Sequence, residues 1–166
     1  ASLIIDDVAH RKVIIFHPTM LPQRVLADPE LTAGLPAHLT AATGVDALVH
    51  NIEAFCSPFY HPLAQGVALE GMKLVHDFLP RAYQNGQDIE ARAQMLSASL
   101  MGATAFQKGL GGVHALAHPI GAVFDTHHGL ANAILLPYVL VRNQEAIAER
   151  LGAAARYLGL ADSSFD

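Results

Sequence analysis

From Leu31 onward the sequence is dominated by alanine and leucine at helical spacing, and this pattern constrains the fold more than any other feature. Glycine, proline and asparagine interrupt the pattern at intervals that are typical of helix ends. Asp88 is a favourable N-cap and Gly159 a favourable C-terminal stop. The pattern predicts a mainly α fold with helices over residues 37–55, 62–79, 89–106, 113–123, 130–142 and 144–158.

The first 30 residues differ from the rest of the chain. Lys12–Phe16 and Arg24–Asp28 have the composition of short strands, and a link containing two prolines separates them. Two strands without a third partner are only marginally stable in water. We therefore expect residues 1–30 to be the end of a longer unit and residues 31–166 to form a helical domain.

Composition excludes several classes of function. Only 15% of the residues are charged, the net charge is −5, and the basic residues are scattered, so we expect no nucleic-acid partner. The longest apolar stretch, residues 133–141, contains Pro137 and is shorter than the roughly 18 residues that a membrane span requires. Cys56 is the single cysteine, and the sequence contains no segment with the basic and apolar pattern of a secretion leader, so we expect a cytoplasmic protein without a membrane segment.

Histidine is unusually frequent, with ten residues against ten lysines and arginines together. Four of them, His114, His118, His127 and His128, fall within a segment that is almost free of charge. Burying several imidazoles is costly unless each ring nitrogen finds a partner. A metal ion resolves this problem because it binds the lone pair of one ring nitrogen of each histidine. The N–H of the other ring nitrogen can then donate a hydrogen bond to a neighbouring group. The alternative is a set of core histidines that are satisfied separately.

A second candidate is the pair Asp46 and His50, which lie four residues apart and therefore on one face of the predicted helix 37–55. They either present an oxygen and a nitrogen to one ion or hydrogen bond to each other. Spacing alone favours His114 and His118 as the second ligand pair. One carboxylate and three imidazoles suit Fe(II), Zn(II), Mn(II) or Ni(II).

Glycines surround the clustered histidines at positions 111, 112, 121 and 129, and they permit close backbone approach there. Glycines 109, 111 and 112 do not continue as a dinucleotide-binding fingerprint, so we reject a phosphate loop.

Two other functions remain open at this point. His76 and Asp77 are adjacent, and with His50 before them and Asp125 after them they follow the order found in HD-type metal-dependent phosphohydrolases. That interpretation leaves the four clustered histidines unexplained. A non-catalytic helical module is the third possibility, and it requires an exposed apolar face.

Residues 25–53 and 111–137 resemble the two signature regions of the iron-containing (group III) alcohol dehydrogenases. The first region has Asp28, Pro36, Asp46 and Glu53 at the family's intervals. The second has the family's order of glycines and histidines and its trailing Asn-Ala, although His127 stands where many members have proline. The resemblance covers essentially the whole chain.

This resemblance implies a ligand set of Asp46, His50, His114 and His128 for Fe(II) or Zn(II), in place of the His118 that spacing favours. It implies that His118 lies beside the metal and the nicotinamide and assists proton handling. NAD or NADP would be the second cofactor, and the residues that contact it cannot be assigned. The activity implied is a metal-dependent alcohol dehydrogenase, which transfers a hydride between an alcohol and the corresponding aldehyde or ketone.

The resemblance also implies a domain organisation and a fold. Residues 31–166 would be the helical metal-binding domain of a dehydroquinate-synthase-like fold. This domain would be truncated at its C-terminal end. Residues 1–30 would be the last strands of an α/β dinucleotide-binding domain. The partners implied are a small alcohol or aldehyde and a second copy of the chain in a homodimer.

Overall fold

Helices dominate the computed structural model, which describes residues 2–6, 11–15 and 17–160. The mainly α fold class expected from the sequence is confirmed. The last residues of the expected helical domain, 161–166, lie outside the described part. The helices are α1 (Ala37–Cys56), α2 (Pro62–Gln84), α3 (Ile89–Ala105), α4 (Gly112–Phe124), α5 (His128–Arg142) and α6 (Gln144–Tyr157).

The helix ends follow the local chemistry that the sequence predicts. Asp88 caps α3, because its carboxylate accepts a hydrogen bond from the Ala91 N–H at 3.0 Å. Gly159 stops α6 with a φ of +74°, a left-handed conformation that glycine adopts easily. The largest difference is in α2, which continues beyond Leu79 through Pro80 to Gln84. Proline removes one helical hydrogen bond there without ending the helix.

The strands agree less well with prediction. An antiparallel pair is formed by β1 (Ser2–Asp6) and β2 (Arg11–Ile15), and β2 corresponds to the predicted strand 12–16, whose last residue lies outside the described part. The predicted strand Arg24–Asp28 is wrong. This segment is irregular and its Leu26 is 93% exposed, because no described strand lies beside it to accept its backbone hydrogen bonds.

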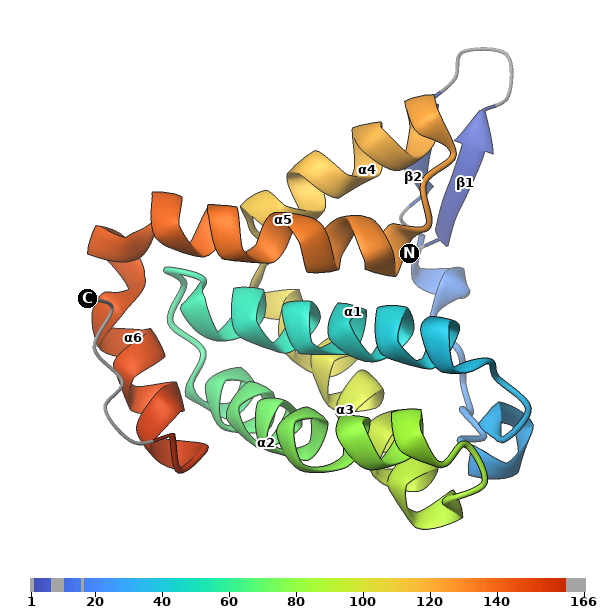
Figure 1. The fold of residues 1–166 in the computed structure, drawn as a ribbon. Helices are drawn as coiled ribbons and strands as arrows, with labels where there is room; N and C mark the ends of the chain where they lie inside the picture. The colour runs from blue at the N-terminus through green and yellow to red at the C-terminus, as the bar shows by residue number, and fades with distance from the viewer. Residues whose placement is uncertain (1, 7–10, 16, 161–166) are drawn as a thin grey trace.

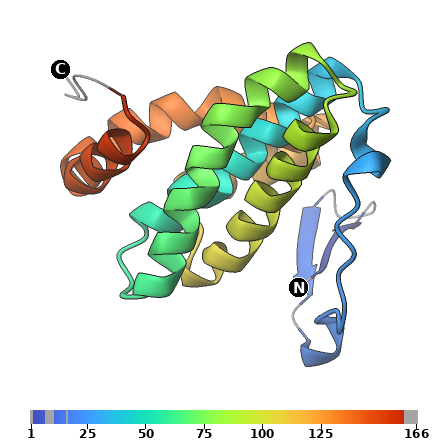
Figure 2. The ribbon, with the colours of Figure 1, turned by 90° about the horizontal axis from the view of Figure 1, so that it is seen from below.

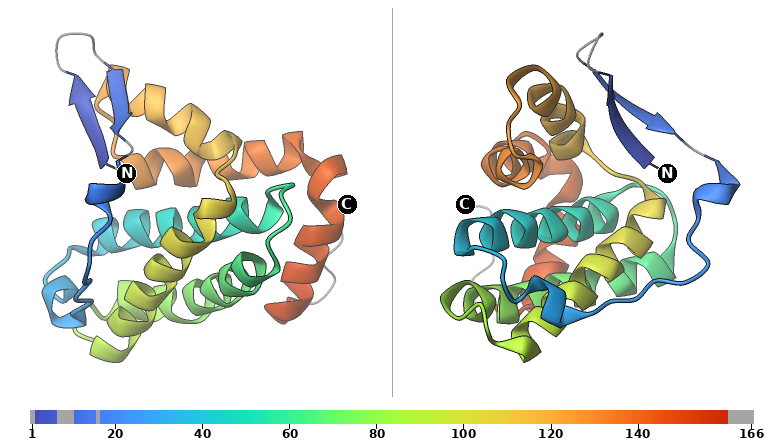
Figure 3. Two further views of the ribbon diagram at one scale, coloured as in Figure 1. Left: turned by 180° about the vertical axis from the view of Figure 1, so that it is seen from behind. Right: turned by 90° about the vertical axis from the view of Figure 1, so that its right-hand side faces the viewer.

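Helix α1 lies in the middle of the molecule, between α4 and α5 on one side and α2 and α3 on the other (Figure 1). Helix α6 crosses one end of this arrangement, and the two strands lie near the opposite end, where β2 contacts α4 (Figures 2 and 3). None of the helices in the described ranges combines the length and the apolar character that crossing a membrane requires. The interface of α1, α2 and α3 consists mostly of small buried side chains, including Ala47, Ala54, Ala64, Ala68, Ala98 and Ala105.

Two cationic side chains hold the C-terminal end of α1. The Lys108 side chain is 4% exposed, and its Nζ donates to the carbonyls of Ala54 and Phe55 at 3.0 and 3.1 Å. Arg150 of α6 donates to the carbonyl of Cys56 at 2.6 Å. Cations at this end satisfy the free carbonyls and oppose the helix dipole. The helix that carries Asp46 is therefore fixed at its end.

Candidate metal centre

Three helices bring a carboxylate and two imidazoles together. Asp46 projects from α1, His114 from α4 and His128 from the first position of α5. Asp46 Oδ1 lies 3.6 Å from His114 Nε2 and 3.6 Å from His128 Nε2. The three residues offer ligand atoms that all lie within 4.8 Å of one another, which is a geometry suited to a transition metal.

His50 lies beside this group, one turn after Asp46 on α1. Its Nδ1 is 3.9 Å from Asp46 Oδ2, and its ring centroid is 4.5 Å from that of His114. Burial lowers the pKa of His50, and this effect exceeds the opposing influence of Asp46. The ring is therefore neutral and keeps a nitrogen lone pair available.

His118 follows His114 by one turn of α4 and lies at the edge of the group. Its ring centroid is 5.2 Å from that of His128 and 5.9 Å from that of His114. The ligand atoms that converge on Asp46 come from His114 and His128, the pair implied by the family resemblance, rather than from the pair favoured by spacing.

Glu53 orients His114 from the side away from Asp46. His114 Nδ1 donates to Glu53 Oε2 at 2.7 Å, and the Val113 N–H donates to Oε1 at 2.7 Å. A carboxylate only accepts, so Nδ1 carries a proton, and Nε2 faces Asp46. A side chain at Gly111 would place its Cβ 2.8 Å from Glu53 Oε1, so the carboxylate that orients His114 would have to shift.

The charges of this cluster depend on one another. Burial opposes ionisation of Asp46 and Glu53, yet hydrogen bonds with His114 lower the pKa of both carboxyl groups. Burial also opposes the charged form of His114, but the two carboxylates raise its pKa to about 9. The metal-free protein therefore holds an imidazolium between two carboxylates at neutral pH, and a bound cation must displace that proton.

The start of α5 lies very close to α1. A Cβ added to Gly129 would be 2.3 Å from the carbonyl oxygen of Ala42, so only glycine fits. His127 caps this helix, since its Nδ1 accepts from the Leu130 N–H at 3.4 Å, and α5 therefore begins two residues before the predicted start. This close approach, of the kind that the glycines around the histidines are expected to permit, brings His128 to Asp46.

Two polar residues near the ligands were not assigned a role from the sequence, namely Glu53 and Asn132. Their spacing from the predicted ligands could have identified both. Glu53 lies two turns after Asp46 on α1, and Asn132 lies one turn after His128 on α5, so each shares the face of a predicted ligand.

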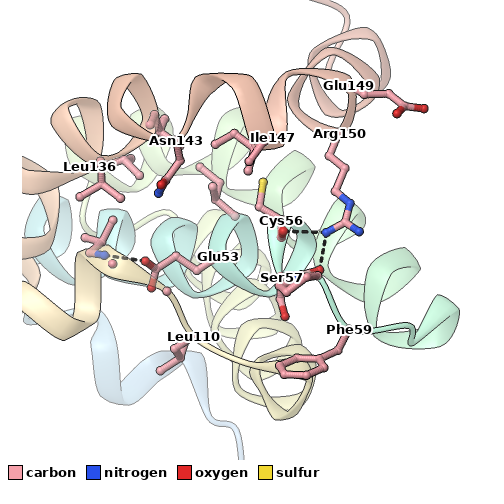
Figure 4. A pocket seen from close by; sticks show the side chains of 18 residues that line it. Glu53, Cys56, Ser57, Phe59, Leu110, Leu136, Asn143, Ile147, Glu149 and Arg150 are labelled. Atoms are coloured by element: carbon pink, nitrogen blue, oxygen red, sulfur yellow. Dashed lines mark hydrogen bonds between the residues drawn. The ribbon is translucent and has the colours of Figure 1, made fainter.

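A cavity of about 490 Å³ lies on the other side of Glu53, between the end of α1 and the start of α6 (Figure 4). Apolar side chains form part of its walls, and Glu53, Cys56, Ser57, Asn143, Glu149 and Arg150 contribute polar groups. Burial raises the pKa of the Cys56 thiol to about 11, so the thiol is protonated at neutral pH.

Comparison with known proteins establishes the family. The model for the C-terminal region of the Fe-containing alcohol dehydrogenase family matches residues 40–165. The chain belongs to the iron-containing alcohol dehydrogenases.

Individual members of this family are similar over most of the chain. The 4-hydroxybutyrate dehydrogenase of Cupriavidus necator is 48% identical over 88% of it, and the NAD-dependent methanol dehydrogenase of Bacillus methanolicus is 39% identical over 95%. The crystal structure of an archaeal halo-thermophilic alcohol dehydrogenase from a Red Sea brine pool has a TM-score of 0.90 at 28% identity, covering 99% of this chain and 42% of its own. The chain spans only 39% and 42% of the length of the two sequence relatives.

The HD-type alternative does not fit the iron-containing alcohol dehydrogenase family or the observed geometry. His76 Nδ1 lies 2.9 Å from Asp77 Oδ1, and Asp77 also pairs with Lys73 on the surface of α2. His76 faces a different cavity, between α1, α2 and α6. Within the described residues, the group with metal-binding geometry contains neither His76 nor Asp77.

The first prediction concerns Gly129. We expect Gly129→Ala to lower the free energy of unfolding by about 1–3 kcal/mol, because the methyl group forces α5 away from α1. Urea denaturation measures this change. Gly66→Ala on α2 is the matched control, since its Cβ meets nothing within 4 Å, and it is expected to be stabilising by about 0.5–1 kcal/mol. Equal effects of the two substitutions would contradict the close approach.

The second prediction concerns pH and the metal-free protein. The pKa of His114 rises from 6.5 in the unfolded chain to about 9 in the fold. Its stabilising contribution is therefore complete below pH 6.5 and is lost as the pH rises through about 9. Urea denaturation with a chelator present should show unfolding free energy falling over this range by on the order of 3 kcal/mol relative to His114→Gln. A constant difference between the two proteins would refute the paired imidazolium.

Proposed function

We propose that the protein is an NAD(P)-dependent alcohol dehydrogenase in which Asp46, His50, His114 and His128 hold Fe(II) or Zn(II). The observation that carries this proposal is the approach of His114 and His128 Nε2 to one oxygen of Asp46, in a chain of the iron-containing alcohol dehydrogenase family. One carboxylate with imidazoles is a ligand set that both metals accept.

The bound metal would supply Lewis-acid polarisation of the alcohol oxygen, and the nicotinamide would supply the redox chemistry. The protein's own residues orient these groups. Glu53 fixes the ring of His114, and Asp46 provides the negative charge that a cation needs. The Asp46 side chain is 22% exposed and that of His128 is 31% exposed, so a small alcohol has access to the group.

His118 is proposed as the residue that receives the hydroxyl proton of the alcohol. Its ring lies at the edge of the group, 5.2 Å between centroids from His128, and the residue is only partly buried. A ring nitrogen in this place can take a proton and return it to solvent.

The remaining parts of the proposal concern the whole protein. We place residues 1–30 at the end of a dinucleotide-binding unit and residues 31–166 in the metal-binding domain, and we propose a homodimer that acts on a small alcohol or aldehyde. The names of the relatives, a 4-hydroxybutyrate dehydrogenase and a methanol dehydrogenase, support a small alcohol as the substrate.

Metal analysis tests the ligand set. We expect one metal ion per chain in the wild-type protein by inductively coupled plasma mass spectrometry, and loss of that metal in Asp46→Ala and in His128→Ala. His76→Ala is the control, because this residue lies outside the group, and it should keep the metal. Loss on changing His76 with retention in both other variants would overturn the proposal.

Turnover of the complete enzyme tests the role of His118. We expect His118→Ala to retain the metal and to lose about 10²–10⁴-fold in kcat, the range usual for a proton-transfer group. Steady-state kinetics with the nicotinamide cofactor and parallel metal analysis measure the two quantities. Full turnover with bound metal would reject the role, and loss of the metal would make His118 a ligand instead.

A further inference from the structure

Asn132 lies against the ligand group and contacts all three of its members. It lies on α5, one turn after His128, and is 0% exposed. Its Nδ2 donates to Asp46 Oδ1 at 2.5 Å, and the same nitrogen lies 3.2 Å from His114 Nε2 and 3.2 Å from His128 Nε2. One amide nitrogen thus touches a ligand atom from each of the three helices.

The chemistry of Asp46 fixes which way this amide points. A carboxylate oxygen only accepts hydrogen bonds, so the amide nitrogen and not the amide oxygen must face Asp46. In this orientation Asn132 Oδ1 is buried without a hydrogen-bond partner among the described residues. Leaving a buried acceptor unsatisfied costs about 1–3 kcal/mol. The hydrogen bond to Asp46 therefore holds the amide in this orientation against that cost. Asn51 Oδ1 is likewise without a partner among the described residues, so what distinguishes Asn132 is that its amide contacts the ligand atoms.

The contact restricts the conformation of the two ligands that it joins. Asp46 Oδ1 is held by Asn132, while Oδ2 faces His50 Nδ1 at 3.9 Å, so rotation of the carboxylate would break the amide contact. His128 and Asn132 come from the same helix, and the amide links that helix to α1. Without this donor, Asp46 and His128 would be free to separate before a cation arrives.

We propose that Asn132 is a positioning residue of the metal centre, which holds Asp46 and His128 in place for the incoming cation. When a cation takes the lone pair of His128, the amide keeps Asp46 as its acceptor. The inference rests on the metal centre proposed above and adds a residue that is not itself a ligand. Removal of the partners of metal ligands generally weakens metal binding by about 10–100-fold.

Zn(II) affinity, measured by competition with a chromophoric chelator, tests this role without reference to activity. We expect Asn132→Ala and Asn132→Leu both to weaken Zn(II) binding by about 10–100-fold. Leucine keeps the branched shape of asparagine and lacks the donor, whereas alanine removes both, so agreement between the two variants assigns the effect to the hydrogen bond. The Co(II)-loaded proteins should also differ from wild type in their visible absorption spectrum, which reports coordination geometry.

Asn51→Ala is the matched control, because Asn51 is also 0% exposed but its amide donates only to the backbone carbonyls of Ala47 and Ala98. It should lower thermal stability and leave Zn(II) affinity unchanged. Unchanged or tighter binding in both Asn132 variants, or an equal loss in Asn51→Ala, would overturn the inference. Absence of Zn(II), Co(II) and Fe(II) binding by the wild-type protein would instead overturn the metal centre itself.

Discussion

The carboxylate of Glu53 is the contact on which the site depends. It accepts the backbone N–H of Val113 at the start of α4 and the Nδ1–H of His114 in the next position, so one side chain of α1 sets both the helix and the ring. The end of α1 is itself fixed by Lys108 and Arg150, which occupy its free carbonyls. Because α1 also carries Asp46 and His50, the same helix defines both sides of the ligand group.

Small residues make this arrangement possible. Gly129 lets α5 approach the backbone of α1, and Gly102 of α3 lies where a Cβ would be 2.9 Å from the Cβ of His50. The result is a buried cluster in which His114 lies between two carboxylates. The two carboxylates favour a positive charge between them. A proton on His114 supplies this charge in the metal-free protein, and a divalent cation supplies a larger one. Protonation and metal binding at this site are therefore competing events.

Much of the fold follows from the sequence because helical spacing, caps and stops are local. The ends of α1, α3 and α6 lie within a residue or two of their predicted places for this reason. Local composition fails for the segment Arg24–Asp28, which it predicts as a strand and which is irregular. A strand needs a neighbouring strand, and local composition does not specify one. Local rules also place the end of α2 too early, at Leu79, whereas the helix continues through Pro80 to Gln84. Packing of the helix outweighs the loss of one hydrogen bond at the proline.

The sequence likewise predicts some residues of the candidate site, while others depend on the tertiary structure. The spacing of Asp46 and His50 places them on one face of a helix. Spacing also favours His118 as a ligand, whereas the ligand atoms that converge on Asp46 come from His114 and His128. The approach of His128 depends on the turn between α4 and α5 and on the clearance at Gly129, which are properties of the tertiary structure. Glu53 and Asn132 contact ligands that lie far away in the sequence, His114 and Asp46, and only the packing of the helices reveals those contacts.

The metal centre can be tested by anomalous X-ray diffraction from crystals of the purified protein, recorded on both sides of the iron and zinc absorption edges. A single strong anomalous peak is expected at bonding distance from Asp46, His50, His114 and His128, and the edge at which it appears identifies the metal. A peak at His76 and Asp77, or none in a protein crystallised with added iron and zinc, would contradict the proposed metal centre.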